Sequence, residues 1–568
     1  MTKISTWFIE VITKGPTLYK QRIRDDKLLI VWMVVLILIR IWLVQAQDLI
    51  ATSTPHDDYL FIKLARHILN GEWLGPYDQF TLIKGPGFPL FIAAAHLAGI
   101  PLMLAEHLLY SLFCVITILA IKPLFHKRWP LMAIFLFLLF NPFMYLYPAT
   151  GRVFRFSITM PLVLAVFASG VGLVTRASGT FIRLLCWASV FGSCFTYLWF
   201  TREEGIWMLP ALLLLAIYFL VVENRHSQKQ YLQRISCLVW VFLIFMGAKT
   251  ILENLNNHYY GAPVIVELKT PQFQSALGGL MAIDGLGSTR FLPVSWRAQK
   301  AGFAVSQCLK ELEACLPEQK NKAKQMNSFY IWLFRDMVRK SGNAETLPEA
   351  LEFYDSIGRE LAQACNDGRL NCLDRKPTIR PVWKQEYNAL LPAALWEVFH
   401  KATSFNRLQM EKNDFRRWTT TAEANQVRDF KFVTLEHLTP GHKHHIAGYP
   451  KFYKRLIENK FRILSDISSF YRSSVPYLFG LAVIFNIAMF IVAIVEKRSL
   501  FYPVIGLIIV TGIFSLVAIL SYIKITLWPI NRPLMAAYML ILFYISLMIS
   551  ISFQELIALK QNKTTNLS

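Results

Sequence analysis

The chain has 568 residues, of which 54% are hydrophobic and only 17% are charged. Typical soluble domains carry about 25% charged residues, so this composition excludes an ordinary soluble protein. The formal net charge is +22, but much of the Lys and Arg lies in short segments between apolar runs, as membrane topology requires. Nucleic acid is therefore not expected as a partner.

Long apolar windows recur along the whole chain. The clearest cover residues 28–44, 131–147, 235–251, 475–495 and 533–551, and each approaches the roughly 20 apolar residues that cross a bilayer as a helix. The windows predict an all-α polytopic membrane protein with about ten transmembrane helices. The basic segment 1–27 precedes the first window, which we interpret as a retained anchor rather than a cleaved signal.

Alternating the spans produces a consistent topology, because the short loops assigned to the inner side are basic. Residues 1–27 and 553–568 are expected to be cytoplasmic tails, and residues 28–252 a transmembrane module whose first outer loop covers 45–84. Residues 253–474 are expected to form a large, mainly helical domain outside the cytoplasm. Residues 475–552 then return as C-terminal transmembrane helices.

Two short helices are expected at the membrane surface. Residues 86–99 are apolar but too few to span. The basic amphipathic stretch that begins near Lys451 is predicted to lie on the membrane before the next span.

Four of the eight cysteines lie in the polar segment 253–474, namely Cys308, Cys315, Cys365 and Cys372. Outside the cytosol, such cysteines are expected to form two disulfides. Four cysteines allow three connectivities, and the spacing leaves all three open.

The first outer loop contains two adjacent carboxylates, Asp57 and Asp58, just beyond the first span. Adjacent like charges raise each other's pKa unless a cation offsets them. This arrangement suits a general base, which needs a tuned proton affinity. The alternative interpretation is a solvated helix cap, since Asp is a favoured N-cap residue.

Further charged side chains lie where predicted spans meet the outer surface. Arg202, Glu203 and Glu204 stand between two apolar runs, where charge is costly and commonly functional; an internal salt bridge between spans is the alternative. Other outer cations are Lys84, Arg152, Arg155 and Arg532. Such groups stabilise a phosphate leaving group, or they snorkel to the interface.

The order of these motifs resembles the GT-C superfamily of integral-membrane glycosyltransferases, which includes bacterial aminoarabinose transferases and protein O-mannosyltransferases. The acidic pair after the first span, the KGPGFPLF segment and the TREEG loop carry the resemblance. It implies that Asp57 or Asp58, with a slight preference for Asp58, deprotonates the acceptor.

The resemblance also implies roles for the other charged residues. Arg202, with Lys84 and Arg532, would hold the donor phosphate, and Glu203 or Glu204 would orient the sugar, the acceptor or a metal ion. Family members often carry an Arg-Tyr pair ahead of the last spans, and Tyr is missing beside Arg532. Members differ in their need for a divalent cation, so the metal stays open.

The implied function is inverting transfer of a sugar from a polyprenyl-phosphate donor to a periplasmic acceptor, which is an envelope glycan, a lipid or a protein. The implied location is a bacterial inner membrane, with the N-terminus cytoplasmic and the active site periplasmic. One alternative is an O-antigen polymerase or ligase, a class that relies on Arg and His in outer loops. Another is a lipid-linked-glycan flippase or transporter, which predicts internal repeats and charges within several spans.

Overall fold

The computed structural model describes residues 24–45, 47, 49–54, 56–145, 151–202, 205–222, 228–284, 294–315, 330–374, 378–381, 383–405, 421–437, 450–527 and 535–567. Within these ranges the regular secondary structure is helical, and β pairing is limited to two isolated bridges. Several of the helices are long and apolar enough to cross a membrane. The protein is therefore an all-α polytopic membrane protein, as predicted.

Eight helices in the described part of the chain have the length and hydropathy of membrane spans. They are Arg24–Val44, α4 (Leu102–Ile121), α6 (Phe156–Val174), α7 (Phe181–Thr201), α9 (Gln228–Tyr260), α18 (Lys451–Val495), α19 (Phe501–Thr526) and α20 (Met535–Leu567). About ten spans were expected, and the difference lies in two helices that are too short.

These two helices are α5 (Trp129–Leu139) and α8 (Leu209–Val221), with 11 and 13 residues. At about 1.5 Å per residue α5 reaches roughly 16 Å. With the 3-10 turn Gly205–Met208 that leads into it, α8 reaches roughly 26 Å, and both lengths are below a bilayer core of about 30 Å. The helix α5 ends before Pro142, and the Asn141 side chain accepts a hydrogen bond from the Phe143 backbone N–H at 3.1 Å. Hydropathy alone does not register such local breaks.

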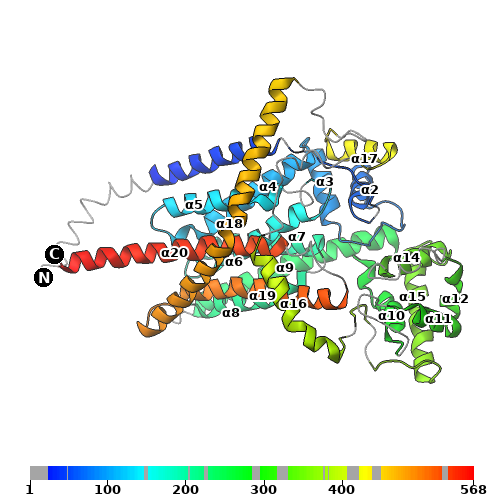
Figure 1. The fold of residues 1–568 in the computed structure, drawn as a ribbon. Helices are drawn as coiled ribbons and strands as arrows, with labels where there is room; N and C mark the ends of the chain where they lie inside the picture. Colours follow the sequence, from blue (N-terminus) through cyan, green and yellow to red (C-terminus); the bar gives the residue numbers. More distant parts are fainter. Residues whose placement is uncertain are drawn as a thin grey trace.

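The helix α6 forms the centre of the membrane region, because every one of its residues is buried. It packs against α4, α7 and α20, as Figure 1 also shows. In contrast, large apolar side chains such as Leu38 in the first span and Ile484 in α18 are exposed. Exposed apolar faces of this kind are expected to contact lipid.

Apart from the end of α9 and the beginning of α18, the described α-helices of segment 253–474 occupy three places. The helices α10 (Pro271–Ala282), α11 (Trp296–Val305), α12 (Gln307–Glu311), α14 (Tyr330–Lys340) and α15 (Leu347–Asn366) gather in an outer bundle at the right of Figure 1. The helix α16 (Leu391–Thr403) packs on α19 and α20. The helix α17 (Ala424–Thr434) packs on α2 (Asp58–Leu69) and α3 (Gly87–Leu97).

The basic stretch near Lys451 is not a separate surface helix. It is the first part of α18, which continues without interruption for 45 residues to Val495. A helix of this length measures about 67 Å, roughly twice the hydrocarbon thickness. The prediction of an independent interfacial helix is therefore wrong, since helical periodicity continues into the span. The other short helix is present as α3 (Gly87–Leu97).

One disulfide is formed, between Cys365 and Cys372, whose Cα atoms are 5.6 Å apart. Cys308 and Cys315 are free, so the prediction of a second disulfide is wrong. The Cys308 Sγ instead lies 3.5 Å from Oε1 of Glu360. Burial and the neighbouring carboxylate raise the pKa of the Cys308 thiol to about 11, which disfavours the reactive thiolate.

Candidate active site

The two adjacent aspartates stand at the beginning of helix α2 (Asp58–Leu69). Apolar residues such as Leu60, Phe61 and Leu64 bury one face of this helix against the membrane module. The two carboxylates nevertheless have different environments. The Asp58 side chain is 0% exposed, whereas the Asp57 side chain is 28% exposed, so only Asp57 is open to a ligand.

Asp58 forms a buried ion pair with Arg152. The Arg152 Nε donates to Oδ1 of Asp58 at 3.0 Å, and Nη2 donates to Oδ2. Nη2 also reaches the hydroxyls of Thr52 and Thr54, at 3.3 and 3.4 Å. A parallel bridge between Ile50 and Arg152 aligns these two segments. Burial raises the pKa of Asp58 above its ordinary value although the guanidinium opposes this shift.

Asp57 pairs with a different cation, Lys84. The Lys84 Nζ lies 2.7 Å from Oδ1 of Asp57 and also donates to the His56 carbonyl oxygen. The ammonium sits 5.1 Å from the centre of the Phe61 ring, and only 8% of the lysine side chain is exposed. The pair therefore combines a sheltered cation with a more accessible carboxylate.

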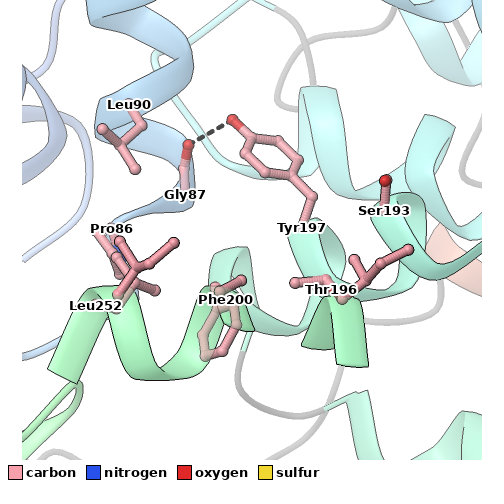
Figure 2. Close-up of a pocket in the computed structure, with 11 residues that line it drawn as sticks. Pro86, Gly87, Leu90, Ser193, Thr196, Tyr197, Phe200 and Leu252 are labelled. Atoms are coloured by element: carbon pink, nitrogen blue, oxygen red, sulfur yellow. Dashed lines mark hydrogen bonds between the residues drawn. The ribbon is translucent and has the colours of Figure 1, made fainter. Parts of the chain in front are cut away.

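Gly87 explains how the loop that carries Lys84 is held. A Cβ at this position would lie 2.1 Å from Oγ1 of Thr201 and 3.0 Å from its Cα, so only glycine fits against the end of α7. The Tyr197 hydroxyl donates to the Gly87 carbonyl at 2.7 Å, as Figure 2 shows. Pro86 and Gly87 also line an apolar cavity of about 340 Å³ between α3, α7 and α9.

Two further arginines lie where the beginning of α6 meets the end of α7. The Arg155 Nη1 donates to the Thr201 carbonyl at 3.2 Å, and the Arg202 guanidinium lies 4.4 Å from the centre of the Phe156 ring. Arg202 also lines a cavity of about 250 Å³. Most of the other lining residues are apolar, among them Met160, Val163, Leu198, Leu516, Ile519, Leu520 and Ile523.

The structure therefore brings together Asp57, Asp58, Lys84 and Arg152, and it connects Arg155 with Arg202 through Thr201. The predicted site residues Glu203, Glu204 and Arg532 lie outside the described residues. Among the side chains that are described, no group of three or more His, Cys, Asp or Glu is placed to hold a metal ion.

Sequence reasoning missed a contact from the outer bundle. His56 stacks on Trp332 of α14, with ring centres 5.7 Å apart, and its Nε2 lies 3.8 Å from Oδ2 of Asp336. Burial lowers the pKa of His56 and raises the pKa of Asp336, which favours the neutral form of both. The sequence shows that His56 lies beside the acidic pair, and this was the available signal for a role of His56. Nothing in the sequence indicates that α14 contacts His56.

No family model and no curated protein matches the sequence. Among solved structures, the chain is similar to ArnT from Cupriavidus metallidurans, in the apo state and bound to undecaprenyl phosphate. Both comparisons have a TM-score of 0.30 and 13% sequence identity and cover 87% of this chain, with 77% and 76% of the respective ArnT chains.

Proposed function

We propose that the protein is a membrane glycosyltransferase that moves a sugar from a polyprenyl-phosphate donor to an acceptor, with inversion at the anomeric carbon. One observation carries the proposal: the partly open Asp57–Lys84 pair stands at the membrane module, linked through Gly87 and Thr201 to the arginine-lined end of α7. The proposed setting is a bacterial inner membrane with the site on the periplasmic side and an envelope glycan, lipid or protein as acceptor.

The proposed donor site combines a cation with an apolar cavity. Arginine suits a phosphate because its fixed fork of N–H donors matches the phosphate oxygens. Arg202 lines the cavity between α6, α7 and α19, whose other lining residues are mostly apolar. In this proposal Arg202 holds the phosphate while the cavity receives the adjacent part of the prenyl chain.

The proposed chemistry assigns the base to Asp57 and not to Asp58, because Arg152 already occupies both oxygens of Asp58. Asp57 accepts the proton of the acceptor hydroxyl, and the hydroxyl oxygen attacks the anomeric carbon. The bond from that carbon to the phosphate oxygen breaks, and polyprenyl phosphate leaves. Lys84 and Arg202 stabilise the negative charge that develops on the leaving group.

The test is transfer of labelled sugar from mixed polyprenyl-phosphate donors in membranes that contain the protein. Asp57→Asn is expected to lower the transfer rate by about 10²–10⁴-fold, the usual contribution of a general base. Arg202→Gln is expected to raise the half-saturating donor concentration. Asp355→Asn is the matched control, because this carboxylate is 50% exposed on α15, away from the site.

Unchanged transfer by a folded and inserted Asp57→Asn variant would remove the proposed base. That result would favour the polymerase or ligase alternative, which depends on Arg and His. A divalent cation remains a proposed partner without an assigned step. Treatment with EDTA, followed by separate addition of Mg²⁺ and Mn²⁺, tests the requirement in the same assay.

A further inference from the structure

The helix α14 of the outer bundle reaches the loop that carries Asp57. Trp332 and Asp336 are four residues apart on α14 and so lie on the same helix face. Both contact His56, which directly precedes Asp57: the Trp332 ring stacks on the imidazole at an interplanar angle of 17°, and Asp336 lies beside Nε2. Two residues from a distant part of the chain thus contact the neighbour of the proposed base.

The position of α14 is held by a neighbouring buried ion pair. Arg335 and Glu267 both have 0% exposed side chains and lie 2.7 Å apart. Arg335 also donates to the carbonyl oxygens of Asp78 and Thr81, at 3.1 and 2.7 Å. Because this arginine lies directly before Asp336, the contacts orient α14 against the loop that continues to Lys84.

The His56–Asp336 contact has unused hydrogen-bonding capacity. At 3.8 Å, Nε2 and Oδ2 are too far apart for a direct hydrogen bond. The Nδ1 of His56 and the Oδ1 of Asp336 are buried without a partner among the described residues. The two side chains still keep 28% and 29% of their surfaces exposed. Because Nδ1 and Oδ1 have almost no accessible surface, the atoms that a ligand can bridge are Nε2 of His56 and Oδ2 of Asp336, 3.8 Å apart.

We propose that His56 and Asp336 form the acceptor subsite and bind a hydroxyl group of a carbohydrate. This proposal rests on the transferase function proposed above. One hydroxyl can lie about 2.8 Å from both Nε2 of His56 and Oδ2 of Asp336, because these two atoms are 3.8 Å apart. The hydroxyl then donates to Oδ2 and accepts from the imidazole N–H at Nε2. The hydroxyl that reacts is then presented to Asp57, and the outer bundle helps to select the acceptor.

The first experiment maps chemical modification of His56 by diethylpyrocarbonate in the purified full chain, with mass spectrometry as the readout. The probes are a glycolipid-containing extract of bacterial envelopes and phosphatidylethanolamine–phosphatidylglycerol vesicles without carbohydrate. The glycolipid extract is expected to slow modification of His56, and the phospholipid vesicles are expected not to. Equal rates with and without the extract, or equal protection by the plain vesicles, would overturn the subsite.

The second experiment measures sugar transfer with the same extract as the acceptor source. Asp336→Asn and His56→Gln are each expected to raise the half-saturating extract concentration by about tenfold, with the donor half-saturation unchanged, as loss of one hydrogen bond to a charged or polar partner predicts. Asp355→Asn is again the control. An unchanged acceptor half-saturation in both variants would contradict the proposal, as would a shift confined to the donor.

The two experiments separate failure of the subsite from failure of the transferase function. Loss of transfer in Asp57→Asn together with normal acceptor saturation in Asp336→Asn would leave the transferase and remove the subsite. Glycolipid-specific protection of His56 together with unchanged transfer by Asp57→Asn would leave a carbohydrate-binding site and remove the proposed reaction. The diethylpyrocarbonate experiment uses the wild-type sequence, so its result stands even if Asp336→Asn fails to fold.

Discussion

Two neighbouring aspartates show how much a single residue's role depends on packing. Asp58 is fully buried and engaged by Arg152, whereas Asp57 is partly exposed and pairs with Lys84. Both carboxylates were candidates for the base on sequence grounds, with Asp58 slightly preferred. The geometry favours a structural role for Asp58 and leaves Asp57 as the proposed base.

This division predicts a large loss of stability at one aspartate and a smaller loss at the other. Asp58→Ala leaves the Arg152 guanidinium buried without its carboxylate, which typically costs about 3–5 kcal/mol of unfolding free energy. Asp57→Asn removes a partly exposed carboxylate but keeps an amide oxygen that can accept from Lys84, so it is expected to cost less than Asp58→Ala. Thermal unfolding of the detergent-solubilised variants measures both changes.

A double variant, Asp58→Ala with Arg152→Met, supplies the control for that comparison. It removes both charges, so it is expected to be more stable than Asp58→Ala alone. If Asp58→Ala unfolded at the wild-type temperature but had lost sugar transfer, Asp58 would be a catalytic group instead of a structural one.

At the scale of elements, α16 shows how part of segment 253–474 joins the membrane module. Phe399 of α16 stacks on Phe514 of α19 with ring centres 5.7 Å apart. Glu397 of α16 pairs with Lys524 of α19 and with Lys401 on its own helix. These contacts dock α16 on the spans rather than on the outer bundle.

The Glu397 contacts predict a dependence of stability on pH. Hydrogen bonds from Lys401 and Lys524 lower the pKa of Glu397 to about 2 from an ordinary value of 4.5. A lowered folded-state pKa means that the stabilisation is present above pH 4.5 and is lost as the pH falls toward 2. The effect is expected to be small and weakened by salt, because 45% of the Glu397 side chain is exposed.

The measurement is the difference in thermal unfolding temperature between the wild type and Glu397→Gln, followed from pH 6 to pH 2.5. The difference should shrink as the pH falls. Asp355→Asn, which also removes an exposed i,i+4 partner but not a contact between helices, is the control. A difference that stays constant over this range would show that the ion pairs do not stabilise the docked helix.

At the scale of the whole molecule, a buried network of hydrogen bonds connects the outer bundle to the loop that carries Lys84. Glu267 pairs with Arg335 and accepts hydrogen bonds from the hydroxyls of Tyr77 and Tyr354, each at 2.9 Å. The Glu267 backbone N–H also donates to the Leu82 carbonyl at 2.9 Å. The loop that ends in Lys84 is thereby connected to α14, to α15 and to the turn Glu267–Lys269.

Arg335→Lys tests this connection while it preserves the charge. Lysine lacks the fork geometry of the guanidinium, so the contacts to Asp78 and Thr81 should be lost. Hydrogen–deuterium exchange is expected to increase in α14 and in residues 78–84, with little change in α6. Arg359→Lys, in an exposed pair on α15, is the control. Unchanged exchange in α14 would indicate that apolar packing alone positions the bundle.

The sequence alone determined the class of the protein and much of the candidate site. The length of the apolar windows and the basic loops between them are enough to predict a polytopic helical protein. Hydropathy is a local property of the sequence, and a bilayer imposes one thickness on every span. The acidic pair and the outer cations were found in the same way, since charge beside an apolar run is visible without a structure.

Only the tertiary structure decided which of these residues meet. Asn141 and Pro142 shorten one span, Cys308 remains free beside Glu360, and Asp336 reaches His56 from a distant helix. Each outcome depends on contacts between segments far apart in the chain, and a periodic pattern along one helix states which face is apolar but not what covers it. The sequence therefore identified the groups of the candidate site, and packing decided which carboxylate is buried, which is open, and which helix completes the site.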